Sequence, residues 1–145
     1  MPAVSVVMPV YNGECYLAEA IESILGQTFT DFEFIIVDDG SRDGSAAIIH
    51  DFAKRDERIR VIQHERNRGL TSARNSGIAA SRGQFVAAMD HDDISLPRRI
   101  EKQADFLHSH PRLGLVGTHV RTLLPDLSVL RIDEFPQCHA EIVLL

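Results

Sequence analysis

The sequence predicts an α/β fold in which helices cover both faces of a mostly parallel sheet. Short, continuous apolar runs alternate along the chain with segments whose apolar residues recur at helical spacing. Continuous apolar runs are typical of strands buried on both faces, and a regular strand–helix alternation is typical of parallel sheets. The chain has 145 residues and 44% apolar content, which suits one domain with an ordinary core.

The first half of the chain predicts two strand–helix units. The β-branched run Val4–Val10 ends at a turn-forming Asn-Gly pair, and residues 14–27 then carry apolar side chains every three or four positions. A second apolar run, residues 34–37, stops at two aspartates. The next helix is marked by a buried stripe at helical spacing, made of Ala46, Ile49 and Phe52.

The second half of the chain repeats this order with shorter strands. Residues 61–62 form a brief strand before the alanine-rich helix Leu70–Ala80. Residues 85–89 form a strand before a helix that begins at Pro97 and ends near Ser109. Beyond that helix we expect three more strands, the last two paired as a hairpin, at residues 113–117, 120–124 and 129–132.

Charge and composition exclude several classes of protein. The chain has 15 Lys and Arg against 21 Asp and Glu, and the resulting net charge of −6 disfavours binding to nucleic acid. No apolar stretch approaches the ~18–20 residues of a membrane span, and no signal peptide is evident. Cys15 and Cys138 form no CxxC motif, so neither a disulfide framework nor a thiolate zinc site is expected. We therefore expect a reduced, cytoplasmic protein.

Polar residues follow each predicted strand, while four familiar motifs are absent. The sequence contains no GxGxxG, GxxxxGK[ST], HExxH or GxSxG, which argues against dinucleotide, P-loop, zinc-hydrolase and serine-hydrolase sites. Ligands of open parallel sheets bind outside the carboxyl ends of the strands. The residues expected at that edge are 9–12, 38–41, 67 with 69, and 90–93.

The strongest candidate site is an acidic run after the fourth strand. Asp90 and Asp92 are two residues apart, so in extended backbone both side chains point the same way and could share one hard cation. Asp93 adds a third carboxylate, and the three repel one another unless a cation offsets them. Alternatively, these acids merely favour the positive end of the next helix. We interpret His64 and His91 as structural or surface residues, with ligand contact by His91 as the alternative.

Four other side chains are candidate ligand contacts, each with a structural alternative. Asp38 and Asp39 point to opposite sides, so one is expected to fix the loop and the other to accept a hydrogen bond from a ligand; alternatively, both belong to an Asp-Gly turn. Tyr11 either stacks on a nucleobase or packs at the rim of the core. Arg74 either reaches a phosphate or a base carbonyl, or is a solvated surface residue.

Four stretches, in this order and spacing, resemble the amino-terminal half of a family 2 glycosyltransferase of GT-A fold. They are residues 4–12 (VSVVMPVYN), 27–43 (QTFTDFEFIIVDDGSRD), 67–77 (NRGLTSARNSG) and 90–103 (DHDDISLPRRIEKQ). The resemblance extends from about residue 4 to residue 118. It implies a Rossmann-like, three-layer α/β/α domain in which residues 1–118 bind the donor and residues 119–145 begin the acceptor-side half.

The resemblance also implies a role for each candidate residue. Pro9 and Tyr11 would flank the base, Asp39 would accept a hydrogen bond from a uracil-like ring nitrogen, and Asn67 and Arg74 would contact the base or the diphosphate. The acidic run would supply the rest, with Asp90 near the ribose, His91 on the ligand, and Asp92 with Asp90 on Mn²⁺ or Mg²⁺. The donor would be a nucleotide-diphosphate sugar, with UDP favoured, and the acceptor a saccharide or a lipid-linked acceptor.

Family 2 enzymes invert the anomeric centre with a carboxylate base from the second half of the domain. No acid after the acidic run matches that base, so we expect a truncated piece of a longer enzyme whose base lies beyond Leu145. The isolated chain would then bind donor but transfer little or no sugar. Apolar surface near residues 129–132 and 142–145 could drive formation of a homodimer. The full-length enzyme could lie against the inner face of the membrane.

Two other classes of function stay open. The chain could be a noncatalytic nucleotide-sugar binding module that is complete at this length. A weaker candidate is a phosphotransfer domain, because Asp90-x-Asp92 is similar to a haloacid-dehalogenase nucleophile strand. That motif lies near the chain start, however, and has Thr or Val where Ile94 stands here. A reading frame that continues beyond Leu145 would favour the enzyme.

Overall fold

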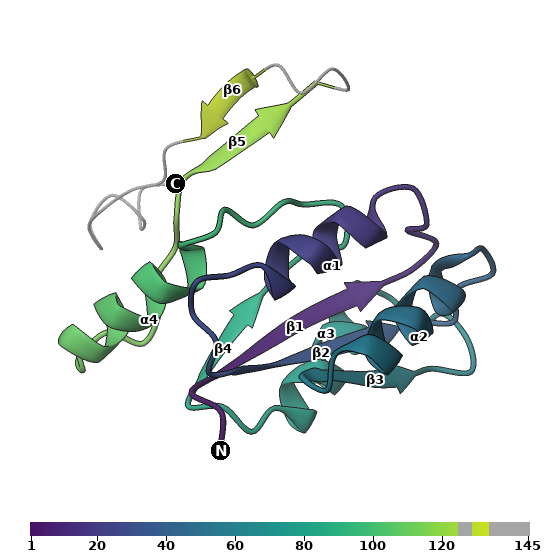
Figure 1. Cartoon of the computed structure of the whole chain (residues 1–145), viewed down its shortest axis with the longest axis horizontal. Helices are drawn as coiled ribbons and strands as arrows, with labels where there is room; N and C mark the ends of the chain where they lie inside the picture. The colour runs from purple at the N-terminus through teal and green to yellow at the C-terminus, as the bar shows by residue number, and fades with distance from the viewer. Residues whose placement is uncertain (125–128, 134–145) are drawn as a thin grey trace. The chain divides into compact units, whose positions relative to one another are not determined.

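Helices cover both faces of a parallel sheet, as the sequence predicts (Figure 1). The computed structural model describes residues 1–124 and 129–133. The chain divides into two compact units, Met1–Ala104 and Asp105–Leu145. The division of function at residue 118, between donor and acceptor halves, stays a prediction.

The sheet of the first unit has four parallel strands in the order β3-β2-β1-β4. The strand β1 (Val4–Val10) lies between β2 (Phe32–Asp38) and β4 (Phe85–Ala88), and β3 (Ile59–Gln63) flanks β2. In register, the last residue of β1 pairs with the last residue of β2, which pairs with the last residue of β3. The carboxyl ends of these three strands therefore reach one edge of the sheet together.

Two buried clusters hold the helices on the sheet. On one face, α1 (Leu17–Leu25) and α2 (Ser45–Arg55) pack on β1 and β2 through fully buried side chains: Leu17, Ile21, Ile24 and Ile49 from the helices, and Met8, Phe34 and Ile36 from the strands. Fully burying such a side chain contributes roughly 1.5–3 kcal/mol. On the other face, α3 (Leu70–Ala80) packs on Val7, Ile35 and Val37. A Cβ at Gly77 would lie 2.4 Å from Cγ1 of Val7, so glycine allows this close approach.

Most predicted elements are confirmed, with differences at their ends. The bounds of β1 and α3 agree with the prediction. The strands β2 and β3 are longer than predicted, because β2 pairs with β1 from Phe32 and β3 pairs with β2 from Ile59 to Gln63. The first helix begins later than predicted, at Leu17, because the carbonyl of Gly13 closes a turn with the amides of Tyr16 and Leu17. The last predicted helix is α4 (Arg99–Ser109), which begins two residues after Pro97.

The strand predicted at residues 113–117 is wrong. This segment has no strand, and Leu115 is 86% exposed. Its two glycines weaken a strand, and within the described residues no strand pairs with it. A strand needs a hydrogen-bonding partner as well as apolar side chains.

The predicted hairpin is confirmed in the second unit. The strand β5 (Val120–Leu123) pairs antiparallel with β6 (Val129–Asp133). Val129, Leu130 and Ile132 are exposed, whereas residues 142–145 and Cys138 lie outside the described residues. Self-association through this surface stays a prediction. Within residues 1–124 and 129–133, no helix has the length and apolar character needed to cross a bilayer.

Candidate functional site

A polar hollow lies at the carboxyl ends of β1, β2 and β3. Its volume is about 380 Å³, at the lower end of the range for ligand pockets. The lining residues follow these three strands: Tyr11, Gly40, Ser41, Arg42, Gln63, His64, Glu65, Arg66 and Asn67. Two of the predicted donor contacts, Tyr11 and Asn67, therefore share one hollow. Pro9 is buried within β1 and does not line it, so of the pair predicted to flank a base only Tyr11 reaches the hollow.

The loops around the hollow are held together by hydrogen bonds between amides and side-chain oxygens and by one close backbone contact. Asn12, at a φ of 52°, donates its amide to Oγ of Ser41 at 3.0 Å, and its Oδ1 accepts from the amide of Arg42 at 2.8 Å. At Gly40, where φ is 73°, a Cβ would lie 2.6 Å from the carbonyl carbon of Arg66. A side chain at position 40 would therefore force the two loops apart.

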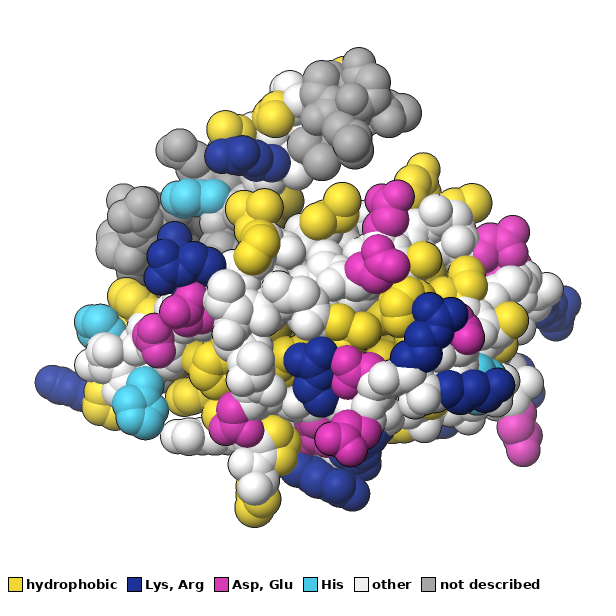
Figure 2. All heavy atoms as spheres, viewed as in Figure 1, with side chains coloured by type: hydrophobic (Ala, Val, Ile, Leu, Met, Phe, Trp, Pro, Cys, Tyr) yellow, Lys and Arg dark blue, Asp and Glu magenta, His cyan; other side chains and the backbone are white. Residues whose placement is uncertain are grey.

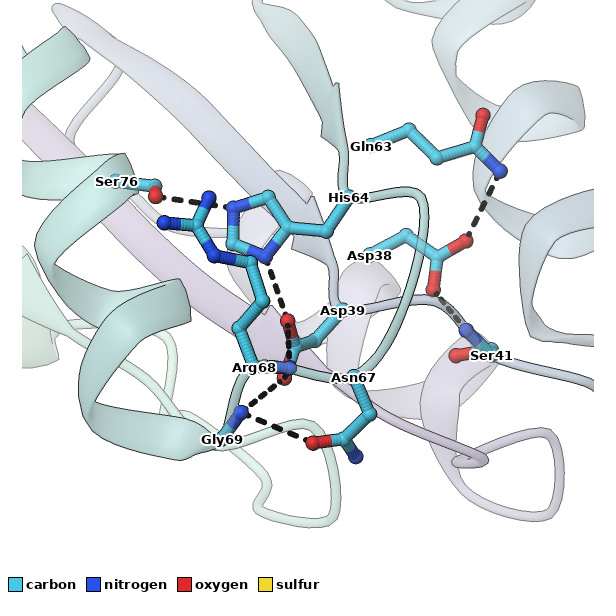
Figure 3. Close-up of polar contacts among 9 residues, drawn as sticks. All are labelled: Asp38, Asp39, Ser41, Gln63, His64, Asn67, Arg68, Gly69 and Ser76. Atoms are coloured by element: carbon cyan, nitrogen blue, oxygen red, sulfur yellow. Dashed lines mark hydrogen bonds and ion pairs between the residues drawn. The ribbon is translucent and has the colours of Figure 1, made fainter.

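Asp39 lies beside the hollow with its carboxylate turned toward the loop of residues 64–69 (Figure 3). The side chain of His64 has its Nδ1 2.5 Å from Oδ1 of Asp39. The amide of Arg68 is 3.0 Å from both carboxylate oxygens, and the amide of Gly69 donates to Oδ2 at 2.8 Å. Burial alone would raise the pKa of Asp39, but these hydrogen bonds outweigh burial and hold the pKa below its ordinary value.

The donors around Asp39 change the interpretation of that residue. A carboxylate has about four acceptor sites, and the protein's own donors approach both of its oxygens. Asp39 is 2% exposed and does not line the hollow. Its observed contacts are those of a residue that fixes the 64–69 loop. The sequence predicts that role for only one of the two aspartates, and ligand binding for the other.

Asp38 holds a different loop from Asp39, as the alternation of side chains along a strand predicts. It is 1% exposed, and its Oδ1 accepts from the amide of Ser41 at 3.0 Å. The side-chain amide of Gln63 donates to its other oxygen at 3.5 Å (Figure 3). Both aspartates are thus buried and hydrogen-bonded to neighbouring loops.

His64 links Asp39 to helix α3. Its Nε2 lies 3.0 Å from Oγ of Ser76, and the residue is 8% exposed, so the structural interpretation of this histidine is confirmed (Figure 3). The carboxylate of Asp39, the imidazole of His64 and the hydroxyl of Ser76 are arranged in space like the acid, base and nucleophile of a hydrolase triad. Ser76, however, lies within α3 rather than on a nucleophile elbow, so the three residues position the loop.

The other predicted contacts gather around Arg74 and Asp90. Nη2 of Arg74, on α3, donates to Oδ1 of Asp90 at 2.6 Å, with the two side chains 34% and 50% exposed. Pairs this exposed contribute about 1 kcal/mol or less. Within the described residues, the buried Nε of Arg74 has no hydrogen-bond partner. An anionic ligand could therefore compete for this guanidinium at low cost.

Residues 90–93, the acidic turn, follow β4. The imidazole of His91 packs on Gly13, where a Cβ would lie 2.3 Å from Cδ2 of the ring. Burial raises the pKa of Asp93, and the like charges of Asp90 and Asp92 raise it further, against the opposing effects of Arg99 and His91. The repulsion predicted from the sequence is therefore present in the folded protein.

The carboxylates of the acidic turn suit one particular kind of metal binding. No three His, Cys, Asp or Glu side chains are arranged to hold a metal within the described ranges. Mg²⁺, and by similar chemistry Mn²⁺, is often held by one or two carboxylates together with the phosphate oxygens of a substrate. The acidic turn fits this arrangement, and not a cage made by the protein alone.

Charged side chains of both signs are interspersed over the face in Figure 2. Arg42 and Arg66 on the hollow were not among the predicted contacts. The missed signal was the position of both arginines just past strand ends. Gln63 was missed for a different reason, because only the packed loops show that it shares the hollow with Tyr11.

The chain is similar to known proteins in both sequence and fold. A family model described as glycosyl transferase family 2 matches residues 5–133. The uncharacterized glycosyltransferase EpsJ of Bacillus subtilis is 52% identical over 120 residues, which cover 81% of this chain and 33% of EpsJ. Residues 1–349 of TarS from S. aureus, solved with UDP-GlcNAc, match 77% of this chain and 32% of that one, with a TM-score of 0.70 and 32% identity.

A third relative was solved with both a nucleotide sugar and a metal. The mannosyltransferase PcManGT of Pyrobaculum calidifontis, in complex with GDP-Man and Mn²⁺, has a TM-score of 0.60 and 25% identity, covering 64% of this chain and 28% of its own. The parallel sheet with its helices and the similarity to the structure of TarS assign the chain to the GT-A class of glycosyltransferase folds. The chain belongs to glycosyl transferase family 2. It spans about a third of the length of the three relatives named here.

Proposed function

We propose that this chain binds a nucleotide-diphosphate sugar, UDP-linked by preference, as the donor-binding part of an inverting glycosyltransferase. The observation that carries the proposal is the hollow at the carboxyl ends of β1–β3, with Tyr11 at its wall, on a chain of family 2. The ligands of TarS and PcManGT support a nucleotide-sugar donor. Residues 1–118 would then form the donor half of the domain, and residues 119–145 the start of the acceptor half.

The hollow would receive the nucleobase. The ring of Tyr11 is exposed enough for a base to stack on it. The side-chain NH₂ of Asn67 could donate to the base while its Oδ1 accepts from the amide of Gly69 at 2.9 Å. Asp39 would act mainly by holding the 64–69 loop, and it reaches a ring nitrogen of the base only if it shares its carboxylate. Pro9 would support the strand beneath Tyr11.

The second group of residues would receive the ribose and the diphosphate. Arg74 would turn from Asp90 toward the phosphates and leave Asp90 for the ribose or the cation. Asp92 would be the first metal ligand, while His91 would contact the ligand from its place against Gly13. Bound Mn²⁺ or Mg²⁺ would stabilise the negative charge of the departing diphosphate.

Transfer requires an acceptor and a base. The oxygen of the acceptor hydroxyl, on a saccharide or a lipid-linked molecule, would bond to the anomeric carbon while the bond from that carbon to the diphosphate oxygen breaks. The hydroxyl proton would pass to a carboxylate base, which we expect in the acceptor-binding part of the longer parent enzyme. Losing a general base typically costs ~10²–10⁴-fold in rate, so this chain alone would transfer sugar weakly or not at all.

Calorimetry with UDP tests the proposal. We expect UDP to bind, and to bind more tightly with Mn²⁺ than with EDTA. Asp92→Asn should remove the gain from Mn²⁺ while the affinity in EDTA and the melting temperature stay unchanged. Absence of UDP binding in both conditions would refute the donor site, and equal affinity in both would refute the metal role alone.

A further inference from the structure

Gln27, two residues after α1 ends, joins two segments that are distant in sequence. It is 5% exposed, and its Nε2 lies 3.0 Å from the carbonyl of Ser23, 3.1 Å from Oγ of Ser95 and 2.8 Å from the carbonyl of Leu96. Its Oε1 accepts from the amide of Ile100 at 3.0 Å. One side chain thereby satisfies an otherwise unpaired amide of the first turn of α4 and fixes the segment that leads into it.

Ser95 extends this connection to Arg99. Nε of Arg99 donates to Oγ of Ser95 at 2.8 Å, and Nη1 donates to the carbonyl of Ala88 at 3.1 Å. The amide of Ser95 also donates to Oγ of Ser23 at 3.0 Å. Arg99 thus joins the end of β4 to the start of α4, so residues 88–99 form a closed loop. The acidic turn lies within this loop.

A closed loop matters because the acidic turn is electrostatically strained. Three carboxylates within four residues, those of Asp90, Asp92 and Asp93, repel one another. Binding sites hold their ligands tightly only when the supporting residues fix the geometry to about 0.5 Å. Anchoring both ends of the loop limits how far the carboxylates can separate before a cation arrives.

We propose that Gln27 is a positioning residue for the acidic turn, and that through Ser95 and Arg99 it holds Asp90 and Asp92 ready for a divalent cation bound with the phosphates of a nucleotide. The inference rests on the proposed function. It goes further by naming residues, none of them a metal ligand, that set the strength of the cation site. Beyond α1, the partners of the Gln27 side chain lie in residues 95–100, at the end of the closed loop and in the first turn of α4.

The variant Gln27→Glu tests this inference. The shape of the side chain and the acceptor for Ile100 are kept, but the donor to Ser95 and Leu96 is replaced by a carboxylate oxygen that faces their carbonyls. Mutation of residues that support the metal ligands without binding the metal typically costs 10–100-fold in metal affinity. We expect the gain in UDP affinity from Mn²⁺ over EDTA to fall by about tenfold or more. The affinity in EDTA should stay within about twofold of wild type, because the hollow is untouched.

Two further variants make the result decisive. Gln103→Glu adds the same charge on α4, and the side chain of Gln103 makes no hydrogen bond within the described part of the chain, so the gain from Mn²⁺ should be unchanged. Ser95→Ala removes only the hydroxyl shared by Gln27 and Arg99, and should reduce the gain less than Gln27→Glu does. Ser95→Ala also provides the test if Gln27→Glu does not fold.

The outcomes separate this inference from the proposed function. If folded Gln27→Glu and Ser95→Ala both keep the full gain from Mn²⁺, Gln27 is not a positioning residue. If Gln103→Glu loses as much of the Mn²⁺-dependent gain in UDP affinity as Gln27→Glu does, the added charge is the cause and the inference is again overturned. If the wild-type chain binds UDP without any gain from Mn²⁺, the metal part of the proposed function fails, and the inference fails with it.

Discussion

The hollow and the acidic turn lie at the same edge of one sheet, yet their carboxylates are stabilised in opposite ways. Beside the hollow, Asp39 is buried and accepts hydrogen bonds from a histidine and two backbone amides, which hold its pKa below the ordinary value. In the acidic turn, Asp93 meets two like charges, which together with burial raise its pKa. Ionisation of Asp39 therefore stabilises the fold, whereas ionisation of Asp93 destabilises it.

This difference indicates which part of the site is complete before a ligand binds. The loops around the hollow are fixed by contacts within the protein, including the close approach of Gly40 to Arg66. The acidic turn has its ends anchored and Asp90 paired with the half-exposed Arg74, but burial and the like charges of Asp90 and Asp92 still raise the pKa of Asp93. We expect base recognition to be largely preformed and phosphate recognition to depend on the ligand and its metal.

The largest expected effect is on stability, from Asp39→Ala. The change leaves the ring of His64 and the amides of Arg68 and Gly69 without their acceptor. Leaving a buried donor without its acceptor costs about 1–3 kcal/mol, and three donors lose theirs, so we expect a loss of about 3 kcal/mol or more, which urea unfolding would measure. The exposed Asp92→Ala should change the free energy of unfolding by about 0.5 kcal/mol or less. Equal losses from the two variants would remove the contrast between the regions.

The next effect is on binding, from Tyr11→Ala. Loss of a stacked ring should weaken UDP binding by ~1–3 kcal/mol. The loss should be the same with Mn²⁺ and with EDTA, because the ring serves the hollow and not the acidic turn. Tyr16→Ala is the matched control, since Tyr16 is 61% exposed and does not line the hollow. A loss seen only with Mn²⁺ would show that the two regions cannot be separated.

The pH dependence of stability should reveal Asp39. The pKa of Asp39 is lowered in the folded protein, so its contribution is fully present above its unfolded value of ~3.9 and is lost as the pH falls through the folded value. Urea unfolding between pH 6 and 3 (roughly, to span that value) should show a smaller loss for Asp39→Asn than for wild type. Parallel curves for the two proteins would contradict the assignment.

The smallest effect is expected from Asp93→Asn. The raised pKa means that ionised Asp93 opposes folding at neutral pH, and that this penalty is relieved as the pH falls. Removing the charge should therefore raise the melting temperature slightly at pH 7. In a calorimetric scan with saturating Mn²⁺ and UDP, that advantage should disappear. A lower melting temperature without ligand would indicate that Asp93 has a stabilising partner.

The sequence predicted the layers and the strand-end edge because those features depend on local patterns. Apolar runs identified β1 and β2, and topology placed residues 38–41 and 90–93 at the carboxyl edge. The apolar run at 113–117 was misleading because apolar side chains alone do not supply a partner strand. Pro9 does not line the hollow, because the ladder of β1 continues past it to Val10 and Pro9 is buried within the strand.

The contacts that the sequence could not reveal are those between distant loops. Nothing in the pattern around Asp39 indicates that His64, 25 residues later, contacts its carboxylate. The sequence prediction gave ligand binding to Asp39 and loop support to Asp38, whereas the structure shows both aspartates supporting loops. Gln27 belonged to a recognised stretch, but its partners lie 68 to 73 residues away.

The long reach of Gln27 also bears on the order in which the chain folds. Contacts between distant residues form late, because closing a long loop costs entropy before the contact repays it. Gln27 can meet Ser95 and Ile100 only after the intervening strands and helices have docked. The acidic turn should therefore be the last part of the site to become ordered during refolding. A newly made chain would be able to hold a base before it could retain a metal.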